Sequence, residues 1–158
     1  EAINTIVQEM ENHREDVVVI FAGYPDEMET LMKGNAGLAS RMPFIIEFPN
    51  YTRQQLTQIF LQMAEKTFTF DEAFKEAVKT YFDALPDEVL SSESFSNARF
   101  VRNLYERTWG KAVLRCQLSK EDAEVLKKED FLAASGEKEF SKLMRKTARD
   151  KVVGFAYQ

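Results

Sequence analysis

The chain has 158 residues, of which 44% are hydrophobic and 30% charged, a balance typical of globular and not of disordered proteins. Its net charge of −5 disfavours nucleic acid as a partner, and one cysteine and one histidine exclude an internal disulfide and a Cys/His metal cluster. No apolar run reaches the ~20 residues of a membrane span and no signal peptide is visible, so we expect a cytoplasmic protein without membrane contact.

The first third of the chain predicts helices that alternate with strands. Apolar residues recur at helical spacing over Ala2–Met10, which indicates a first helix. The continuous run Val17–Ala22 is rich in β-branched residues, as in a strand buried on both faces of a parallel sheet. Pro25 suits the first turn of a second helix, which Gly34–Gly37 ends. Phe44–Phe48 then predicts a second strand.

Helices are predicted for the rest of the chain. Thr52 precedes Gln55 in the pattern of a capping box, and Asp71 stands where its carboxylate can cap the next helix. These residue types satisfy backbone N–H groups that a helix start leaves unpaired, so both positions are predicted helix starts.

A long helix is predicted to begin at Asn97, after a polar loop over Leu85–Ser96. A short helix is expected around Ser119–Asp122 and a charged one over Glu137–Lys151. The apolar residues predicted to face inward from the long helix are Val101, Leu104, Tyr105, Trp109, Val113 and Leu114.

Two parallel strands do not form a stable sheet on their own. The missing strands must come from upstream residues or from another chain, or the two segments must rearrange. The chain also opens at Glu1 inside a helical pattern, so we expect a piece of a longer protein. We further expect Val17–Phe21 and Phe44–Phe48 to be poorly protected, or paired between chains, because open apolar strand edges attract partners.

Three segments resemble the second half of an AAA+ ATPase module, in order and at compatible spacing. They read VVVIFAGYP at Val17–Pro25, NAGLASRMPFIIEF at Asn35–Phe48 and NARFVRNLYER at Asn97–Arg107. The resemblance extends over Glu1–Phe131 and is greatest to the branch with stage V sporulation protein K and the red-type Rubisco activase. In that branch, the helix after the Walker B strand is similar to EAINTIVQEMENHR at Glu1–Arg14.

The resemblance implies a mostly α-helical chain in three parts. Residues 1–50 would be the C-terminal part of an α/β nucleotide-binding domain, with about two strands of a parallel sheet. Residues 51–134 would form a helical lid domain, and residues 135–158 a helical extension. The sequence contains neither the phosphate-binding loop G-x-x-x-x-G-K-[ST] nor an apolar strand ending in Asp-Glu. We therefore expect ATP and Mg²⁺ in the intact parent, and neither tight nucleotide binding nor ATP hydrolysis by this chain alone.

Arg41 matches the arginine finger of the family, which is offered to ATP held by the neighbouring subunit. A guanidinium stays charged and binds phosphate oxygens in pairs, so it stabilises charge that develops on the γ-phosphate. Many relatives have two arginines here, but Ala39 occupies the first place, so Arg41 would act alone. The alternative is a surface arginine in a weak ion pair.

Arg99 matches the sensor-2 arginine, which reaches from the lid to the nucleotide of the same subunit. It follows Asn97 in the first helical turn, where backbone N–H groups also favour anions. Ser96 replaces the glycine of the family's G-N-A-R motif, and that change preserves the turn. Arg102, one turn on, is the alternative for this role, unless it pairs with Glu106 on the helix surface.

Tyr24 stands at the sensor-1 position, where the wider superfamily has Asn, Thr or Asp to orient the attacking water. A tyrosine does not carry that role over directly. Packing or hydrogen bonding is the alternative role for its side chain.

Three functions compete. The resemblance implies a homo-oligomeric ring, a hexamer, whose neighbouring subunits couple ATP hydrolysis to the remodelling of a protein substrate. The alternative is a non-catalytic helical interaction module, in which Thr52–Arg115 bind a partner helix. A DNA-binding helix–turn–helix on the Asn97 helix is disfavoured by the acidic charge and the missing turn–helix spacing.

Overall fold

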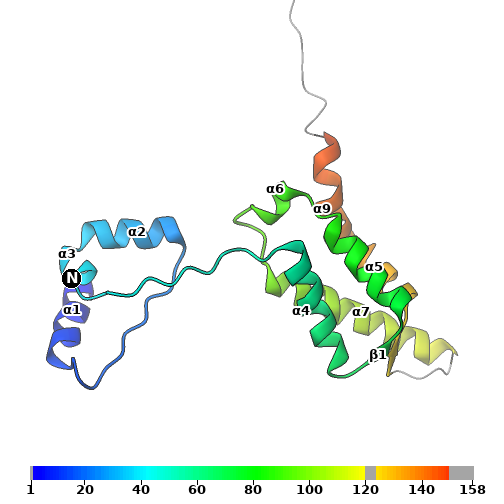
Figure 1. Cartoon of the computed structure of the whole chain (residues 1–158), viewed down its shortest axis with the longest axis horizontal. Coiled ribbons are helices and arrows are strands. Elements are labelled where there is room, and N and C mark those ends of the chain that lie inside the picture. The colour runs from blue at the N-terminus through cyan, green and yellow to red at the C-terminus, as the bar shows by residue number, and fades with distance from the viewer. Residues whose placement is uncertain (1, 120–123, 150–158) are drawn as a thin grey trace, which may run out of the picture. The chain divides into compact units, whose positions relative to one another are not determined.

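The computed structural model describes residues 2–119 and 124–149, in two compact units, Glu1–Phe48 and Pro49–Gln158 (Figure 1). The first unit contains α1 (Ala2–Asn12), α2 (Pro25–Gly34) and α3 (Ala36–Ala39). Pro25 occupies the first turn of α2, as predicted. The short helix α3 contacts both α1 and α2, and Leu38 is the one buried residue among residues 2–48.

The two apolar segments predicted as strands are not strands in the structure. Val17–Ala22 and Phe44–Phe48 have no regular secondary structure, and Figure 1 draws both as plain coil. Their side chains face solvent: Val18 is 88% exposed and Phe48 is 90% exposed. A strand needs a neighbour to pair its backbone groups, and the described residues of the first unit offer none. The prediction of strands at Val17–Ala22 and Phe44–Phe48 is therefore wrong for this structure.

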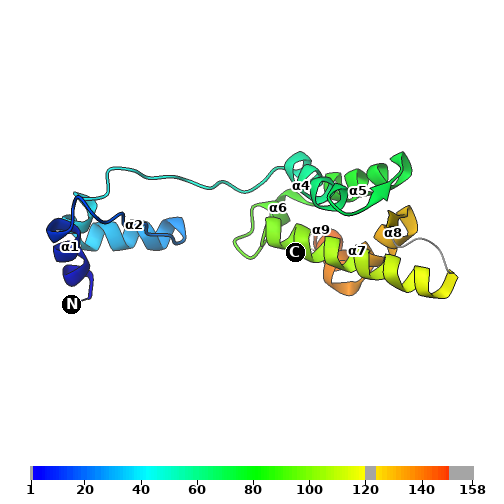
Figure 2. The ribbon, with the colours of Figure 1, turned by 90° about the horizontal axis from the view of Figure 1, so that it is seen from below.

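The second unit is a helical bundle, which confirms the mostly helical fold. Its helices are α4 (Arg53–Glu65), α5 (Glu72–Asp83), α6 (Asp87–Leu90), α7 (Ala98–Ser119), α8 (Lys128–Ser135) and α9 (Lys138–Arg149). The long helix α7 contacts α4 and α8, while α5 packs against the same two helices from the other side of the core (Figure 2). A short parallel sheet joins β1 (Thr69–Phe70) to β2 (Val125–Leu126), with Thr69 opposite Val125.

The predicted caps of α4 and α5 are present. The Thr52 hydroxyl accepts a hydrogen bond from the Gln55 N–H at 3.2 Å, and the Gln55 side chain accepts one from the Thr52 N–H at 2.9 Å. The Asp71 carboxylate accepts from the Phe74 N–H at 2.9 Å. Both helices therefore begin where local sequence chemistry predicts.

Other boundaries differ from the prediction. The loop over Leu85–Ser96 contains the one-turn helix α6, which was not predicted. The helix expected around Ser119–Asp122 falls almost wholly on residues 120–123, which lie outside the described residues. The predicted final helix corresponds to α9, and its predicted end at Lys151 also lies outside them.

Aromatic rings form the centre of the second unit. Phe60 of α4 is fully buried, and its ring centroid lies 5.3–6.2 Å from those of four other rings. These belong to Phe74, Phe82, Tyr105 and Phe131, so α5, α7 and α8 all meet at Phe60. Edge-to-face ring pairs add to the free energy gained by burial.

The inward face of α7 was predicted only in part. Val101 and Leu104 are buried, as predicted, and the buried face continues through Thr108 and Ala112. Trp109 is 48% exposed and Leu114 55% exposed, because neither lies on the stripe that these buried residues define. Within residues 2–119 and 124–149, no helix is both long enough and apolar enough to cross a membrane.

Candidate functional site

Arg41 lies on the turn that follows α3 in the first unit. Its Nε donates a hydrogen bond to one carboxylate oxygen of Glu11 at 3.1 Å, and its Nη2 forms an ion pair with the same oxygen at 3.0 Å. Its Nη1 donates to the Gly37 carbonyl at 3.1 Å. The side chain of Arg41 is 35% exposed and that of Glu11 56% exposed. An ion pair this exposed contributes only ~0.2–1 kcal/mol. Glu11 therefore orients Arg41 without holding it strongly.

Tyr24 is the residue before α2, with an extended backbone at φ −72° and ψ 147°. Its side chain makes no capping hydrogen bond and is 68% exposed. The preceding residue, Gly23, lies close to the Met28 side chain: a Cβ added at Gly23 would be 3.1 Å from the Met28 sulfur. Within the first unit, the ring of Tyr24 thus faces solvent.

Arg99 and Arg102 lie on the first two turns of α7, and both are exposed. The Arg99 backbone N–H donates to the Ser96 carbonyl at 3.0 Å. Among the residues that the structure describes, neither guanidinium forms an ion pair or hydrogen bond, and the suggested Arg102–Glu106 pair is not formed. Two cations next to the positive end of a long helix can attract an anion such as a phosphate group.

Asn97 is the neighbour of this turn that the sequence did not single out for function. Its φ of 47° is the only positive value of a non-glycine residue in the described part of the chain. Its side-chain oxygen accepts from the Tyr51 N–H at 3.0 Å, and its side-chain nitrogen donates to Asn50 Oδ1 at 2.8 Å. Its place as the first residue of the N-A-R pattern was the only sequence signal, and it was interpreted simply as a helix start.

The structure brings together two of the four predicted site residues. Arg99 and Arg102 share one helix face of the second unit, one turn apart, whereas Arg41 and Tyr24 belong to the first unit. The arginines of the first and second units are thus carried by separate compact bodies.

No group of three or more His, Cys, Asp or Glu side chains suited to a metal ion occurs in residues 2–119 and 124–149. A groove of about 640 Å³ lies between α5, α8 and Met144, and none of the four predicted site residues lines it. Its lining is mainly apolar, so it is not a phosphate site.

Four side chains with shifted pKa values belong to the framework of the second unit: Lys75, Lys79, Tyr81 and Glu137. The hydrogen bond to Glu72 raises the pKa of Lys75. A hydrogen bond from Lys111, with the charges of Lys111 and Arg107, lowers the pKa of Glu137. Burial raises the pKa of Tyr81, whose hydroxyl donates to the Phe140 carbonyl at 3.2 Å. The hydrogen bond to Asp83 raises the pKa of Lys79. None of them is a predicted site residue.

Comparison with known proteins places the bundle in a described family. The family model of the AAA lid domain matches residues 52–141. A CfxQ homologue of Pyropia yezoensis is 39% identical over 138 residues, which cover 87% of this chain and 44% of that protein. Stage V sporulation protein K of Bacillus subtilis is 34% identical over 136 residues, 83% of this chain and 42% of that protein.

A third relative is the chloroplastic ribulose bisphosphate carboxylase/oxygenase activase of Cyanidioschyzon merolae. It is 39% identical over 110 residues, which cover 68% of this chain and 36% of that protein. The chain thus spans less than half the length of each of these three relatives.

Proposed function

The chain belongs to the AAA+ ATPase family, and we propose that it supplies the arginine finger and the sensor-2 lid of an ATPase that works as a ring. In this proposal residues 1–50 complete a nucleotide-binding domain, residues 51–134 form the lid and residues 135–158 extend it. ATP and Mg²⁺ are bound by the intact protein, through phosphate-binding and Walker B segments that this sequence does not contain.

The exposed guanidinium of Arg99 is the observation that carries the proposal. It stands at the start of the longest helix of the lid, and no described side chain neutralises it. A cation in this position can contact the phosphates of a nucleotide bound by the same subunit and stabilise the charge that grows during phosphoryl transfer. Arg102 follows one turn later and is the second candidate for this contact.

Arg41 acts on the neighbouring subunit. Its exposed pairing with Glu11 is weak, so a γ-phosphate in a water-poor interface can replace the carboxylate as its partner. The hydrogen bond to the Gly37 carbonyl can remain during that exchange and keep the side chain extended from its turn. Tyr24 is retained at the water-orienting position.

Protein remodelling is the proposed output. AAA+ ATPases form oligomeric rings and act on protein substrates. One relative is named as an activase of ribulose bisphosphate carboxylase/oxygenase, which is an action on another protein, and a second is named for sporulation. The two names differ in biological setting. We therefore propose ATP-dependent remodelling of a protein substrate as the class of activity. The proposed form is a hexamer of identical subunits in the cytoplasm.

The first test is the coding sequence immediately upstream of Glu1. An in-frame phosphate-binding loop, followed by an apolar strand ending in Asp-Glu, supports the proposal and defines the protein to assay. A start codon directly at Glu1 overturns it, and a non-catalytic helical interaction module then takes its place.

ATP turnover by that complete protein is the second test. Arg41→Ala and Arg99→Ala should each reduce it, Arg41→Ala by on the order of 10³-fold or more, as for other arginine fingers. Arg14→Ala in the first unit and Arg107→Ala on α7 are matched controls and should leave turnover within about 2-fold, the usual effect of an exposed side chain. Unchanged turnover in Arg41→Ala would favour the interaction module.

Mixed rings separate action in trans from action within one subunit. Subunits with Arg41→Ala keep an intact nucleotide site, and subunits without the Walker B glutamate keep an intact finger. Mixing these two inactive proteins should restore turnover, because some neighbours then form a complete site. Mixing Arg99→Ala subunits with the Walker B variant should restore none, since each subunit has a damaged site of its own. The opposite pattern would contradict the two assignments.

A further inference from the structure

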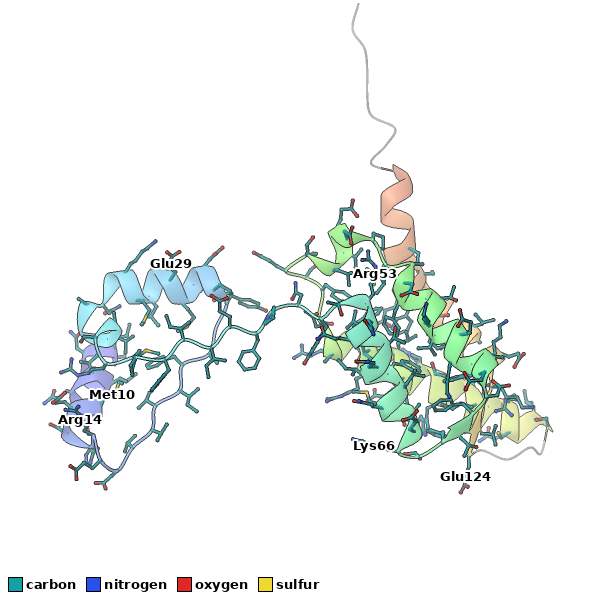
Figure 3. All side chains as sticks on the ribbon, in the orientation of Figure 1. Met10, Arg14, Glu29, Arg53, Lys66 and Glu124 are labelled. Carbon is teal, nitrogen blue, oxygen red and sulfur yellow. The ribbon has the colours of Figure 1, made fainter. Side chains whose placement is uncertain are left out.

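The residues that lead into α4 are fastened to two other parts of the second unit. We call residues 49–53 the lead-in segment; Arg53, at its end, is labelled in Figure 3. The side-chain nitrogen of Asn50 donates to the Leu90 carbonyl at 2.9 Å, at the end of α6. Arg53 donates from Nε and Nη2 to the Leu85 carbonyl, at 2.9 and 2.6 Å, just before α6. The lead-in segment is thus fixed to both sides of the short helix α6.

Asn97 fastens the same segment to the start of α7. One side-chain amide serves both functions: its oxygen accepts from the Tyr51 N–H at 3.0 Å, and its nitrogen donates to Asn50 Oδ1 at 2.8 Å. The nitrogen also lies 3.3 Å from the Phe95 carbonyl, to which it donates. A donor and an acceptor on one short side chain are needed here, which among the common residues only asparagine provides at this length.

The backbone of Asn97 is strained to make these contacts. Its φ of 47° lies in the left-handed region, which costs free energy in every residue except glycine and is tolerated best by asparagine and aspartate. Glycine would adopt this φ more easily, but it has no amide to bind the lead-in segment. The chain therefore has a strained residue at a position where its side chain joins the start of α7 to the lead-in segment. The two bonded residues of that segment, Tyr51 and Asn50, lie 46 and 47 positions before Asn97 in the sequence.

We propose that Asn97 is a positioning residue for Arg99. With Asn50 it clamps the lead-in segment to the first turn of α7, and so determines where the Arg99 guanidinium stands relative to the residues through which the chain enters the lid. The inference rests on the proposed sensor-2 role of Arg99, which is two positions from the clamp. It assigns to an amide pair the alignment of the lid cation with the nucleotide.

The clamp itself is tested on this chain by amide hydrogen exchange measured with NMR. Asn97→Gly keeps the positive φ and removes the amide, so α7 still begins at the same residue. The Tyr51 N–H should then exchange roughly 2- to 10-fold faster, as for the loss of one hydrogen bond. Asn103→Ala, an exposed asparagine on the same helix, is the control and should leave Tyr51 unchanged. Unchanged exchange of Tyr51 in Asn97→Gly overturns the clamp.

Positioning is tested by ATP turnover of the complete protein at saturating ATP. Asn97→Gly should lower turnover by roughly 10- to 100-fold, the range expected when a catalytic group is displaced by about 1 Å. Asn50→Ala removes the partner without touching the strained backbone and should act in the same direction. Asn103→Ala should have no effect.

The double variant Asn97→Gly/Arg99→Ala distinguishes positioning from a general structural role. If Asn97 acts through Arg99, the double variant is no slower than Arg99→Ala alone, because the two changes damage one function. If the losses multiply, Asn97 supports only the fold and the inference is overturned. If Arg99→Ala alone leaves turnover unchanged, the proposed function fails as well, whereas multiplied losses leave that function intact.

Discussion

The guanidinium of Arg115 donates two hydrogen bonds to the carboxylate of Asp130, from Nε at 3.0 Å and from Nη2 at 2.9 Å. The Asp130 side chain is 3% exposed, and that of Arg115 18% exposed. Nη2 also donates to the Val125 carbonyl at 2.8 Å, while Asp130 accepts from the Lys127 N–H at 2.9 Å. One ion pair thus joins α7, β2 and the start of α8.

Replacing Asp130 by alanine should destabilise the bundle by ~3–5 kcal/mol, because the partner cation is then left poorly compensated in a buried site. The free energy of unfolding in urea, followed by the fluorescence of Trp109, measures this. Glu129→Ala changes the neighbouring exposed carboxylate and should cost less than about 1 kcal/mol. Equal losses in the two variants would show that burial of the pair contributes little.

Replacing Phe60 by alanine should cost ~3–5 kcal/mol, since its ring fills the centre of the aromatic core and leaves a cavity. Phe48→Ala is the matched control on the first unit, where the ring is 90% exposed. That change should stay within about 0.5 kcal/mol. Thermal and urea unfolding of both variants check the difference; a large loss in Phe48→Ala would mean that its ring is buried in solution.

Tyr81 should make the protein sensitive to alkaline pH. Burial raises the pKa of its phenol above the ordinary value of 10, so the folded state keeps the proton while the unfolded state releases it. The stabilising contribution is complete below pH 10 and is lost as the pH rises towards the folded-state pKa, at up to ~1.4 kcal/mol per pH unit.

Unfolding of Tyr81→Phe between pH 8 and pH 11 tests this. At pH 8 the variant should be less stable by ~0.5–1.5 kcal/mol, since it lacks the hydrogen bond to the Phe140 carbonyl. The difference should shrink above pH 10 and then reverse. Tyr24→Phe changes a 68% exposed position, so its free energy of unfolding should follow that of the original protein at every pH between 8 and 11.

Backbone amides of residues 18–22 and 44–48 should exchange with solvent almost as fast as in an unfolded chain. None of these N–H groups has a hydrogen-bond partner in the described part of the chain. Helix α4, whose residues Leu56 and Phe60 are fully buried, should be among the slowest segments. Strong protection of residues 18–22 would indicate that two chains pair these segments, which sedimentation then checks.

Local sequence chemistry predicted the helix starts well. Thr52 with Gln55 and Asp71 act within one turn of themselves, so the contacts that they make depend on nearby residues only. The mostly helical fold was likewise predictable from apolar spacing. The resemblance added the family, which the match of residues 52–141 confirms.

Long-range contacts were not predictable from local patterns. Asn50 and Asn97 are 47 positions apart, and Arg115 and Asp130 are 15 apart, so no periodicity links them. Trp109 was assigned to the apolar stripe of the long helix by its spacing, although the buried stripe of α7 passes through the polar Thr108 instead. Val17–Ala22 has the composition of a strand, but composition cannot supply the neighbours that a strand needs. The roles of Arg41, Tyr24, Arg99 and Arg102 remain predictions.

Leu38 is the single buried side chain among the described residues 2–48, and this has a calorimetric consequence. Heat capacity rises on unfolding in proportion to the apolar surface that becomes hydrated, and residues 2–48 have little such surface left to expose. A melting transition of this chain should therefore show a heat-capacity increment of about 1.2–1.5 kcal/mol/K, appropriate to the described residues 49–119 and 124–149, instead of the roughly 1.9–2.4 kcal/mol/K of a fully packed chain of this length. If the first unit were joined to the sheet strands that it needs, the heat-capacity increment should rise towards the larger value. Calorimetry would then detect that these residues have acquired a hydrophobic core.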